Sequence, residues 1–294
     1  MTDFFGIPIP LLLGQLLLGL VNGSFYALLS LGLAVIFGLL GVVNFAHGAF
    51  YMLGAFAAWV GLDLLGINYW LALLLSPLVV GTLGIVLERL FLRHLYKVDP
   101  LYGLLLTFGL ALIAEGVLRE LYGSSGQSYP VPELLQDSVN LGFMILPIYR
   151  AWVIVASLVV CFSTWFVIEK TSLGSTLRAA TENPKLVQAF GINVPVIVML
   201  TYGAGVALAA FAGVLSAPII QVSPLMGSSL VTVVFAVVVI GGMGSIMGAI
   251  VSGLVLGVIE GLTKVIYPEA SNIVVFVIMA IVLFWRPAGF FGKD

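Results

Sequence analysis

The long apolar runs of the chain constrain its fold more than any other feature, because each approaches the length of a membrane-spanning helix. About 20 apolar residues, rising 1.5 Å each, cross a hydrocarbon layer about 30 Å thick. Eight mainly apolar runs are present: Leu11–Leu40, Ala49–Leu65, Trp70–Leu87, Leu101–Leu121, Ala151–Ile168, Val194–Ile220, Leu230–Ile259 and Ile273–Trp285. The sequence therefore predicts an all-α, polytopic transmembrane bundle in one domain over residues 1–294.

Charged residues are too scarce for a soluble protein. The chain has 11 Lys and Arg and 13 Asp and Glu among 294 residues, so 8% are charged, whereas soluble domains carry about 25%. This composition excludes a soluble enzyme. The net charge of −2 provides no basic field for nucleic acid, so no nucleic-acid partner is expected.

Two of the runs are too long for one straight crossing, and each contains residues that favour a break. Asn22-Gly23-Ser24 lies within the first run, and Gly241-Gly242-Met243-Gly244 lies within the seventh. Irregular backbone at membrane depth is tolerated where it packs in protein or lines a cavity. We therefore predict broken or re-entrant helices at both places. No internal repeat is clear, although Gly-rich breaks near 44–54 and 241–253 hint at one.

Orientation follows from the cations, which favour the cytoplasmic side. Eight cations fall inside when the N-terminus is periplasmic and the C-terminus cytoplasmic: Arg89, Arg93, Lys97, Lys170, Arg178, Lys185, Arg286 and Lys293. The run Leu230–Ile259 must then begin and end on the outer side, as a hairpin bent at Gly241–Gly244. The last helix is expected to open at Pro268 and to reach Arg286.

Polar residues inside apolar runs are costly, and they usually face protein or a cavity. The residues predicted to line a translocation path or to contact substrate are Asn22, Ser24, Tyr26, Asn44, His47, Thr107, Gly241, Gly242 and Gly244. For Asn44, capping a half-helix is as good an interpretation as binding substrate. His47 is interpreted as a structural histidine near the cytoplasmic face, and Thr107 as bonded to its own helix. Glu115 and Arg119, four residues apart, are expected to pair.

Motifs for catalysis are not found in the sequence. It contains neither a G-x-x-x-x-G-K-[ST] phosphate loop nor an H-E-x-x-H metal motif. The two histidines, His47 and His94, fall in different segments, and the single Cys161 is interpreted as a core residue. We therefore expect no enzyme, no bound metal and no cofactor.

The polar stretch 169–193 has the signals of two short helices. Asn183-Pro184 is an N-cap and first-turn pair, and Gly191 suits the position after a helix C-terminus. These signals predict a helix over about Pro184–Phe190, preceded by another over about Ser175–Thr181. Leu186, Val187 and Phe190 would give the second helix an apolar face, for a partner protein or for lipid headgroups.

Three sets of residues in order resemble the permeases of branched-chain amino acid ABC importers, especially their first permease, whose relatives carry urea and short amides. They are Asn44-Phe-Ala-His-Gly48, then Arg178-Ala-Ala with Asn183-Pro184 and Gly191-Ile-Asn193, then Gly241-Gly-Met-Gly244 with Gly248-Ala249. The resemblance implies a type II importer-like permease in a bacterial inner membrane. Its implied partners are a second homologous permease, two ATP-binding cassette subunits that bind the ATP, and a periplasmic substrate-binding protein.

The same resemblance makes residues 169–193 the loop that couples the permease to the ATPase. The residues assigned to coupling on this basis are Arg178, Ala179, Glu182, Asn183, Pro184, Leu186, Val187, Phe190 and Gly191. The expected function is a permease subunit for branched-chain amino acids or related small solutes, with urea or short amides as the alternative. A stand-alone carrier or channel would need a mid-membrane acid, for which Glu115 is the only candidate. An intramembrane enzyme would need a catalytic constellation.

Overall fold

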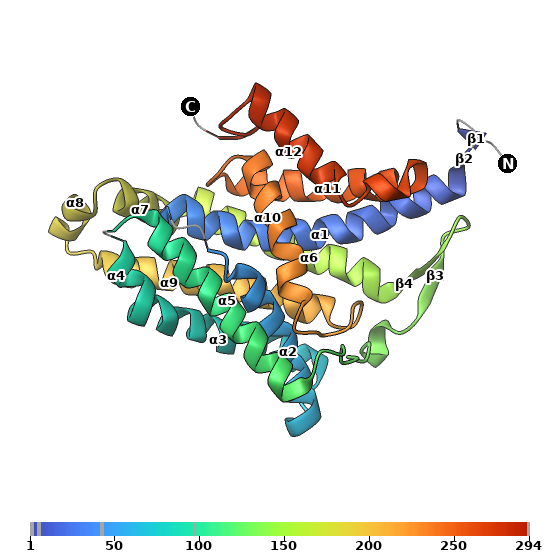
Figure 1. Cartoon of the computed structure of the whole chain (residues 1–294), viewed down its shortest axis with the longest axis horizontal. Helices are drawn as coiled ribbons and strands as arrows, with labels where there is room; N and C mark the ends of the chain where they lie inside the picture. Colours follow the sequence, from blue (N-terminus) through green and yellow to red (C-terminus); the bar gives the residue numbers. More distant parts are fainter. Residues whose placement is uncertain (1–2, 5–6, 42–43, 97, 293–294) are drawn as a thin grey trace.

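The computed structural model describes residues 3–4, 7–41, 44–96 and 98–292, and it shows a bundle of long helices (Figure 1). Lys97 and Lys293, which the charge argument used, lie outside the described residues. The α-helices are α1 (Ile9–Leu40), α2 (His47–Leu65), α3 (Tyr69–Leu87), α4 (Arg93–Leu95), α5 (Pro100–Tyr122), α6 (Ile148–Lys170), α7 (Ser172–Glu182), α8 (Pro184–Ala189), α9 (Val194–Ser216), α10 (Met226–Gly241), α11 (Ile246–Ile266) and α12 (Val274–Trp285).

Shorter elements complete the description. A π-helical segment, η1 (Glu88–Leu92), joins α3 to α4, and η2 (Glu133–Leu135) and η3 (Pro268–Ala270) are single 3₁₀ turns. Strands β1 (Asp3–Phe4) and β2 (Ile7–Pro8) pair antiparallel, as do β3 (Ser138–Asn140) and β4 (Ile145–Pro147), where Val139 lies opposite Leu146.

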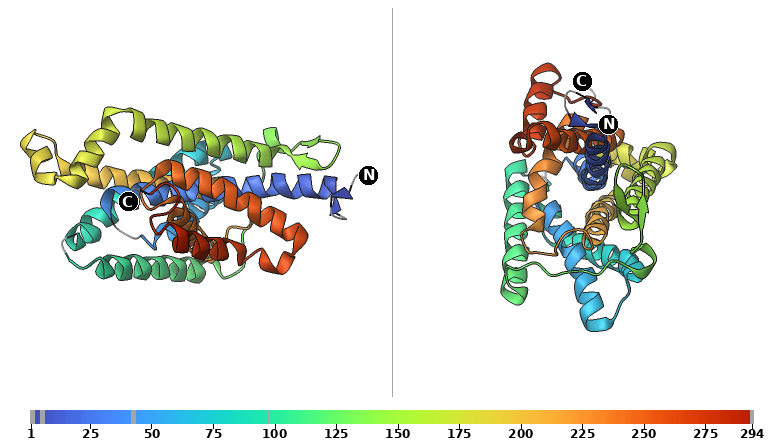
Figure 2. Two further views of the ribbon diagram at one scale, coloured as in Figure 1. Left: turned by 90° about the horizontal axis from the view of Figure 1, so that it is seen from above. Right: turned by 90° about the vertical axis from the view of Figure 1, so that its right-hand side faces the viewer.

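Within the described residues, seven helical segments are long and apolar enough to cross a membrane, which confirms the predicted polytopic fold. They are Ile9–Gly38, His47–Leu65, Tyr69–Leu95, Pro100–Tyr122, Ile148–Lys170, Val194–Ser216 and Ile246–Ile266. The bundle has two distinct ends (Figures 1 and 2). One carries α7 and α8 and is called the α7–α8 end; the other carries β1–β2 and β3–β4 and is called the hairpin end.

The most extensive helix packing joins α1 to α11, which run antiparallel. A Cβ added to Gly257 would overlap the backbone of Gly23, and one added to Gly261 would meet the backbone of Gln15 and Gly19. Small residues allow such close approach, which supplies dispersion contacts where lipid offers no hydrophobic driving force. The four-residue glycine spacing on α11 is therefore a packing surface within the chain.

The predicted break at Asn22-Gly23-Ser24 is wrong, because α1 is one continuous helix of 32 residues. Gly23 allows α11 to approach, and the Ser24 hydroxyl donates to the Leu20 carbonyl at 2.8 Å, within the helix. Gly23 and Ser24 therefore allow close packing and local bonding within an unbroken helix. Asn22 therefore does not lie at a helix interruption.

The predicted bend at Gly241–Gly244 is confirmed, but its two arms are unequal. Gly242 and Gly244 have φ of 98° and 88°, a backbone region that favours glycine. α11 continues past Ile259 to Ile266 and has membrane length, whereas α10 has 16 residues. The final helix also differs from the expectation: Pro268 opens a 3₁₀ turn, and α12 begins only at Val274.

A test of the α1–α11 packing is to substitute Gly257 with Ala. The added methyl group would overlap the Gly23 backbone, and overpacking of this kind costs about 1–3 kcal/mol. The variant is expected to have a clearly lower melting temperature in detergent. The matched control is Gly116→Ala on α5, where a Cβ would meet nothing within 4 Å. Equal melting temperatures for the two variants would contradict this packing.

Candidate translocation site and coupling helix

Two helices begin in the middle of the bundle, where their first turns meet. A Cβ on Gly48 would overlap the carbonyl oxygen of Gly227, and a Cβ on Gly227 would overlap that of Gly48. Gly48 is in the first turn of α2, and Gly227 is in the first turn of α10. The level is set by His47, whose Nε2 lies 2.9 Å from the carbonyl oxygen of Leu29, in the middle third of α1. The non-helical backbone before α2 and before α10 therefore reaches membrane depth. It is buried in protein there, which satisfies its polar groups away from lipid.

Side chains hold the segment that precedes α2 in place. Asn44 Oδ1 accepts from the Ala46 amide at 3.1 Å, and Asn44 Nδ2 donates to the Tyr202 hydroxyl at 3.1 Å. The Thr107 hydroxyl accepts from the Phe45 amide at 3.1 Å and donates to the Leu104 carbonyl at 3.0 Å. Asn44 therefore fixes the residue just before α2, but it is not the N-cap of that helix, because the N-cap is Ala46 and has no side-chain capping bond. Thr107 bonds its own helix, as predicted, and also links α5 to this segment.

Phe45 fills the space between α5 and α10. Its ring stacks on Phe235 of α10 at 6.0 Å between centroids, and it meets Phe108 of α5 edge to face at 6.4 Å. Such aromatic pairs add stabilisation beyond the buried area. The three rings form a cluster, the Phe45 plug, beside the meeting point of α2 and α10.

A cavity of about 60 Å³ lies next to the Phe45 plug. Its lining comes from the beginnings of α2 and α10 and from α5: Phe45, Gly48, Ala49, Met52, Phe108, Ala111, Leu112, Glu115, Pro224, Gly227, Ser228 and Val231. At about 30 Å³ per water, the cavity holds roughly two waters. A small solute does not fit, so the structure shows this region closed.

The lining includes Glu115, but this carboxylate already has a partner. Arg119 Nη2 donates to Glu115 Oε1 at 2.6 Å, which confirms the predicted pair. The negative charge of Glu115 is therefore balanced by Arg119, one helical turn further along α5.

His47 is buried, as a structural histidine should be, but its predicted place near one face is wrong. It lies level with Leu29 of α1 and not near an end of that helix. Its Nδ1 has no hydrogen-bond partner among the described residues. His47 is the first residue of α2, and its ring packs beside Gly32 of α1. The ring lies at this depth because α2 begins inside the bundle.

Gly241, Gly242 and Gly244 lie away from the Phe45 plug. Gly244 packs on Gly38, toward the α7–α8 end of α1. The C-terminal segment closes over this bend, because the Phe290 amide donates to the Ile240 carbonyl at 2.9 Å and the Phe291 amide donates to that of Gly241 at 3.1 Å. The structure therefore does not join these glycines to Asn44, His47 and Thr107.

Two buried carboxylates were missed by the sequence interpretation, because charged residues were taken as the ends of runs. Glu260, 8% exposed, accepts from the Tyr26 hydroxyl at 2.6 Å and from Lys264 Nζ at 2.6 Å. Glu88, also buried, accepts from the Tyr96 hydroxyl at 2.9 Å. Burial, with the Glu88 carboxylate beside it, raises the pKa of the Tyr96 hydroxyl, which therefore remains a donor. The four-residue spacing of Glu260 and Lys264 was the signal available.

Two long helices of the bundle run in opposite directions, and each is followed by a helix that begins inside the bundle. α1 starts at the hairpin end and is followed by the late-starting α2, whereas α9 starts at the α7–α8 end and is followed by α10 (Figure 1).

The predicted helices of residues 169–193 are confirmed as α7 and α8. Asn183 Oδ1 accepts from the Leu186 amide at 3.1 Å, and Gly191 follows the helix with φ of 83°. The predicted common apolar face is wrong in one respect. Val187 is buried against Ala180 and Val194, whereas Leu186 and Phe190 are 54% and 77% exposed.

Burial of Val187 fixes α8 on the ends of α7 and α9, so that the exposed pair is held rigidly. Arg178 adds a further contact, since its Nη1 donates to the Ile168 carbonyl at 3.2 Å and lies 3.5 Å from Glu169 Oε2. The remaining residues assigned to coupling lie exposed along this end: Ala179, Glu182, Asn183, Pro184 and Gly191.

Comparison with known proteins identifies the family. Residues 15–283 match the family described as the branched-chain amino acid transport system permease component. The chain is 30% identical to the high-affinity branched-chain amino acid transport system permease proteins BraD of Pseudomonas aeruginosa and LivH of Escherichia coli K12, with 96% of each chain covered. It is 27% identical to LivM of Escherichia coli K12, over 90% of this chain and 67% of that protein. No solved structure matches the chain. A match across nearly the whole bundle, including both late-starting helices and the α7–α8 segment, shows that the chain belongs to the permease-component family of branched-chain amino acid transport systems.

Proposed function

We propose that the chain forms half of a path for branched-chain amino acids, opened and closed by ATP-binding subunits that contact α8. The observation that carries this proposal is the exposed pair Leu186 and Phe190, held on a capped helix whose Val187 is buried against its neighbours. Exposed large aromatic side chains of this kind act as anchors at protein interfaces. A rigid helix transmits a displacement, whereas a flexible loop would absorb it.

Membership of the family supports a set of partner proteins for this chain. LivH and LivM are both permease proteins of such systems, which supports a second, homologous permease beside this chain. We further propose two ATP-binding cassette subunits at the α7–α8 end and a soluble binding protein at the hairpin end. In this arrangement the α7–α8 end is cytoplasmic and the hairpin end periplasmic, within a bacterial inner membrane.

The Phe45 plug is the proposed gate. Its central residue, Phe45, lies on non-helical backbone that is anchored to α5 and α9 through Thr107 and Tyr202. The adjoining cavity of about 60 Å³ is too small for an amino acid, so transport requires these rings to separate. The first turns of α2 and α10 would then offer unpaired amides and positive dipole ends to a substrate carboxylate, as in other membrane carriers with broken helices.

The relatives' names favour branched-chain amino acids over urea or short amides. The stand-alone carrier remains distinguishable by experiment. Glu115 is paired with Arg119, and neither Glu88 nor Glu260 lines the cavity beside the plug. The full complex, reconstituted in liposomes, is expected to accumulate radiolabelled leucine only with ATP and binding protein. Accumulation by this chain alone, driven by an ion gradient, would contradict the proposal.

A test of coupling is Phe190→Asp. A carboxylate at an apolar anchor should remove about 2 kcal/mol or more of interface energy, so uptake is expected to fall at least about tenfold while the complex still inserts in the membrane. ATP hydrolysis should lose its stimulation by substrate-loaded binding protein. The matched control is Gln188→Asp, which places the same charge on an exposed polar position of α8. Normal coupling in Phe190→Asp would refute the assignment.

A test of the gate is Phe45→Ala. Removing one of the three rings should leave the closed state leaky, and passive leucine entry into liposomes without ATP is expected to rise several-fold. The control is Phe166→Ala, which removes an exposed ring from α6. If passive leucine entry is as slow with Phe45→Ala as with the control, Phe45 does not close the path.

A further inference from the structure

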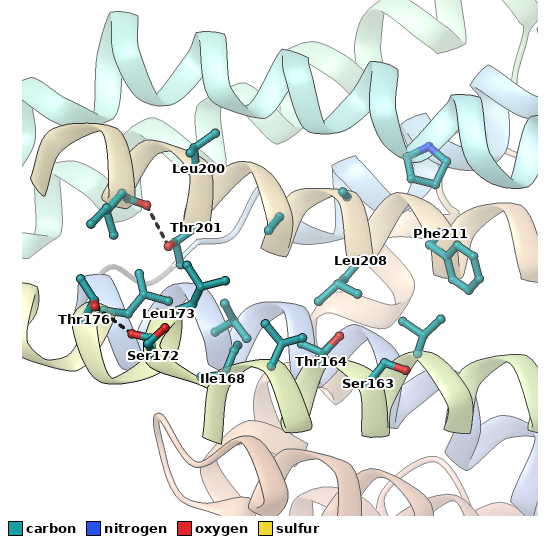
Figure 3. Close-up of a pocket in the computed structure, with 18 residues that line it drawn as sticks. Ser163, Thr164, Ile168, Ser172, Leu173, Thr176, Leu200, Thr201, Leu208 and Phe211 are labelled. Carbon is teal, nitrogen blue, oxygen red and sulfur yellow. Dashed lines mark hydrogen bonds between the residues drawn. The ribbon is translucent and has the colours of Figure 1, made fainter. Parts of the chain in front are cut away.

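A groove of about 690 Å³ runs between α6 and α9 and ends under α7 (Figure 3). Val35 of α1 and Pro77 of α3 contribute to its floor. Most of its side chains are aliphatic or aromatic, among them Val160, Ile168, Leu173, Leu200, Leu208 and Phe211. It is separate from the cavity beside the Phe45 plug, and neither the gate nor the exposed face of α8 uses it.

The groove lies between α6 and α9, and Figure 2 shows α6 on the opposite side of the bundle from α5 in both views. Because α6 and α9 both have membrane length, the opening lies at the height of the hydrocarbon layer. Whatever fills the groove therefore enters from the bilayer and not from water.

The groove offers few hydrogen bonds to a ligand. The Thr201 hydroxyl donates to the Ile197 carbonyl at 2.8 Å, and the Thr176 hydroxyl donates to the Ser172 carbonyl at 2.7 Å, so both serve their own helices. Ser163, Thr164 and Ser172 are the other lining residues with hydroxyl groups, so a polar solute would find few groups to replace its hydration. An apolar ligand is favoured.

The groove is long enough for the acyl chain of one leaflet. Its lining on α9 extends from Ile197 to Phe211, and 14 rises of 1.5 Å span about 21 Å. Half of a hydrocarbon layer about 30 Å thick is about 15 Å. An extended acyl chain can therefore lie along α9 from the α7 end toward Phe211.

Two cations flank the α7 end of the groove. Lys170 lies at the end of α6, with its Nζ 5.6 Å from the ring centroid of Trp165, and Arg178 of α7 donates to the carbonyl of Ile168, a lining residue. Glu169 lies 3.5 Å from Arg178 and offsets part of this charge. Lys and Trp at helix ends mark the level of lipid headgroups.

We propose that one acyl chain of a bilayer phospholipid occupies this groove, with its headgroup at the Lys170–Arg178 end. The chain fills the space between α6 and α9 and supports α7 from below, through Leu173 and Leu177. The lipid is then a structural part of the element that carries α8. Its presence depends only on the chain spanning a membrane, and not on the proposed gate or partners.

The experiment uses the full chain, alone and with a second permease, in nanodiscs that contain phosphatidylcholine with a photoreactive diazirine on one acyl chain. After illumination, labelled peptides are mapped by mass spectrometry. A diazirine near the chain terminus is expected to label α9 around Leu208 and Phe211, and one near the carbonyl is expected to label α7 and the end of α6. The reversed order would overturn the proposed orientation.

Two variants test whether the labelling comes from lipid bound in the groove. Ala204→Phe places a ring in the groove from an exposed lining position, and Val159→Phe places the same ring on an exposed position of α6 outside it. Groove labelling should fall several-fold in Ala204→Phe and stay unchanged in Val159→Phe. Equal labelling in both variants, or loss of groove labelling when a second permease binds, would overturn the proposal. Since labelling needs no transport, failure of the proposed function would not affect this result.

Discussion

Close approach of helix backbones is the constraint on which the rest of the structure depends. In lipid there is no hydrophobic gain from bringing apolar helices together, so association relies on dispersion contacts and on small residues. α1 packs on α11 through Gly19, Gly23, Gly257 and Gly261, and α2 meets α10 at Gly48 and Gly227. The first contact fixes a rigid pair across the bundle. The second places two helix beginnings at the middle of the membrane, where non-helical backbone is otherwise not tolerated.

Most helices could be predicted from the sequence, because membrane length and apolar composition leave few alternatives. The runs Leu101–Leu121 and Ala151–Ile168 differ from α5 and α6 by only a few residues at each end. The short α8 was also predictable, since Asn183 and Gly191 are local signals. These features depend on neighbouring residues along the chain.

Features that depend on distant contacts were not predictable. Asn22-Gly23-Ser24 looks like a break until Gly23 is seen against α11, 230 residues away in the sequence. Glu260 looks like the end of a helix until Tyr26 and Lys264 are seen to satisfy its carboxylate. The Gly-rich stretches at 44–54 and 241–253 hinted at a repeat, but they pack against different partners, because Gly48 meets Gly227 of α10 whereas Gly244 meets Gly38 of α1.

The central claim is that movement at α8 opens the buried region around the Phe45 plug. The most direct measurement places a cysteine at Ala49, which lines the adjoining cavity and is buried, and follows its rate of modification by a small thiol reagent in the reconstituted complex. The native Cys161 is buried and contributes little background. The account predicts slow modification at rest and much faster modification while the complex turns over ATP with substrate and binding protein. An unchanged rate during turnover would contradict it.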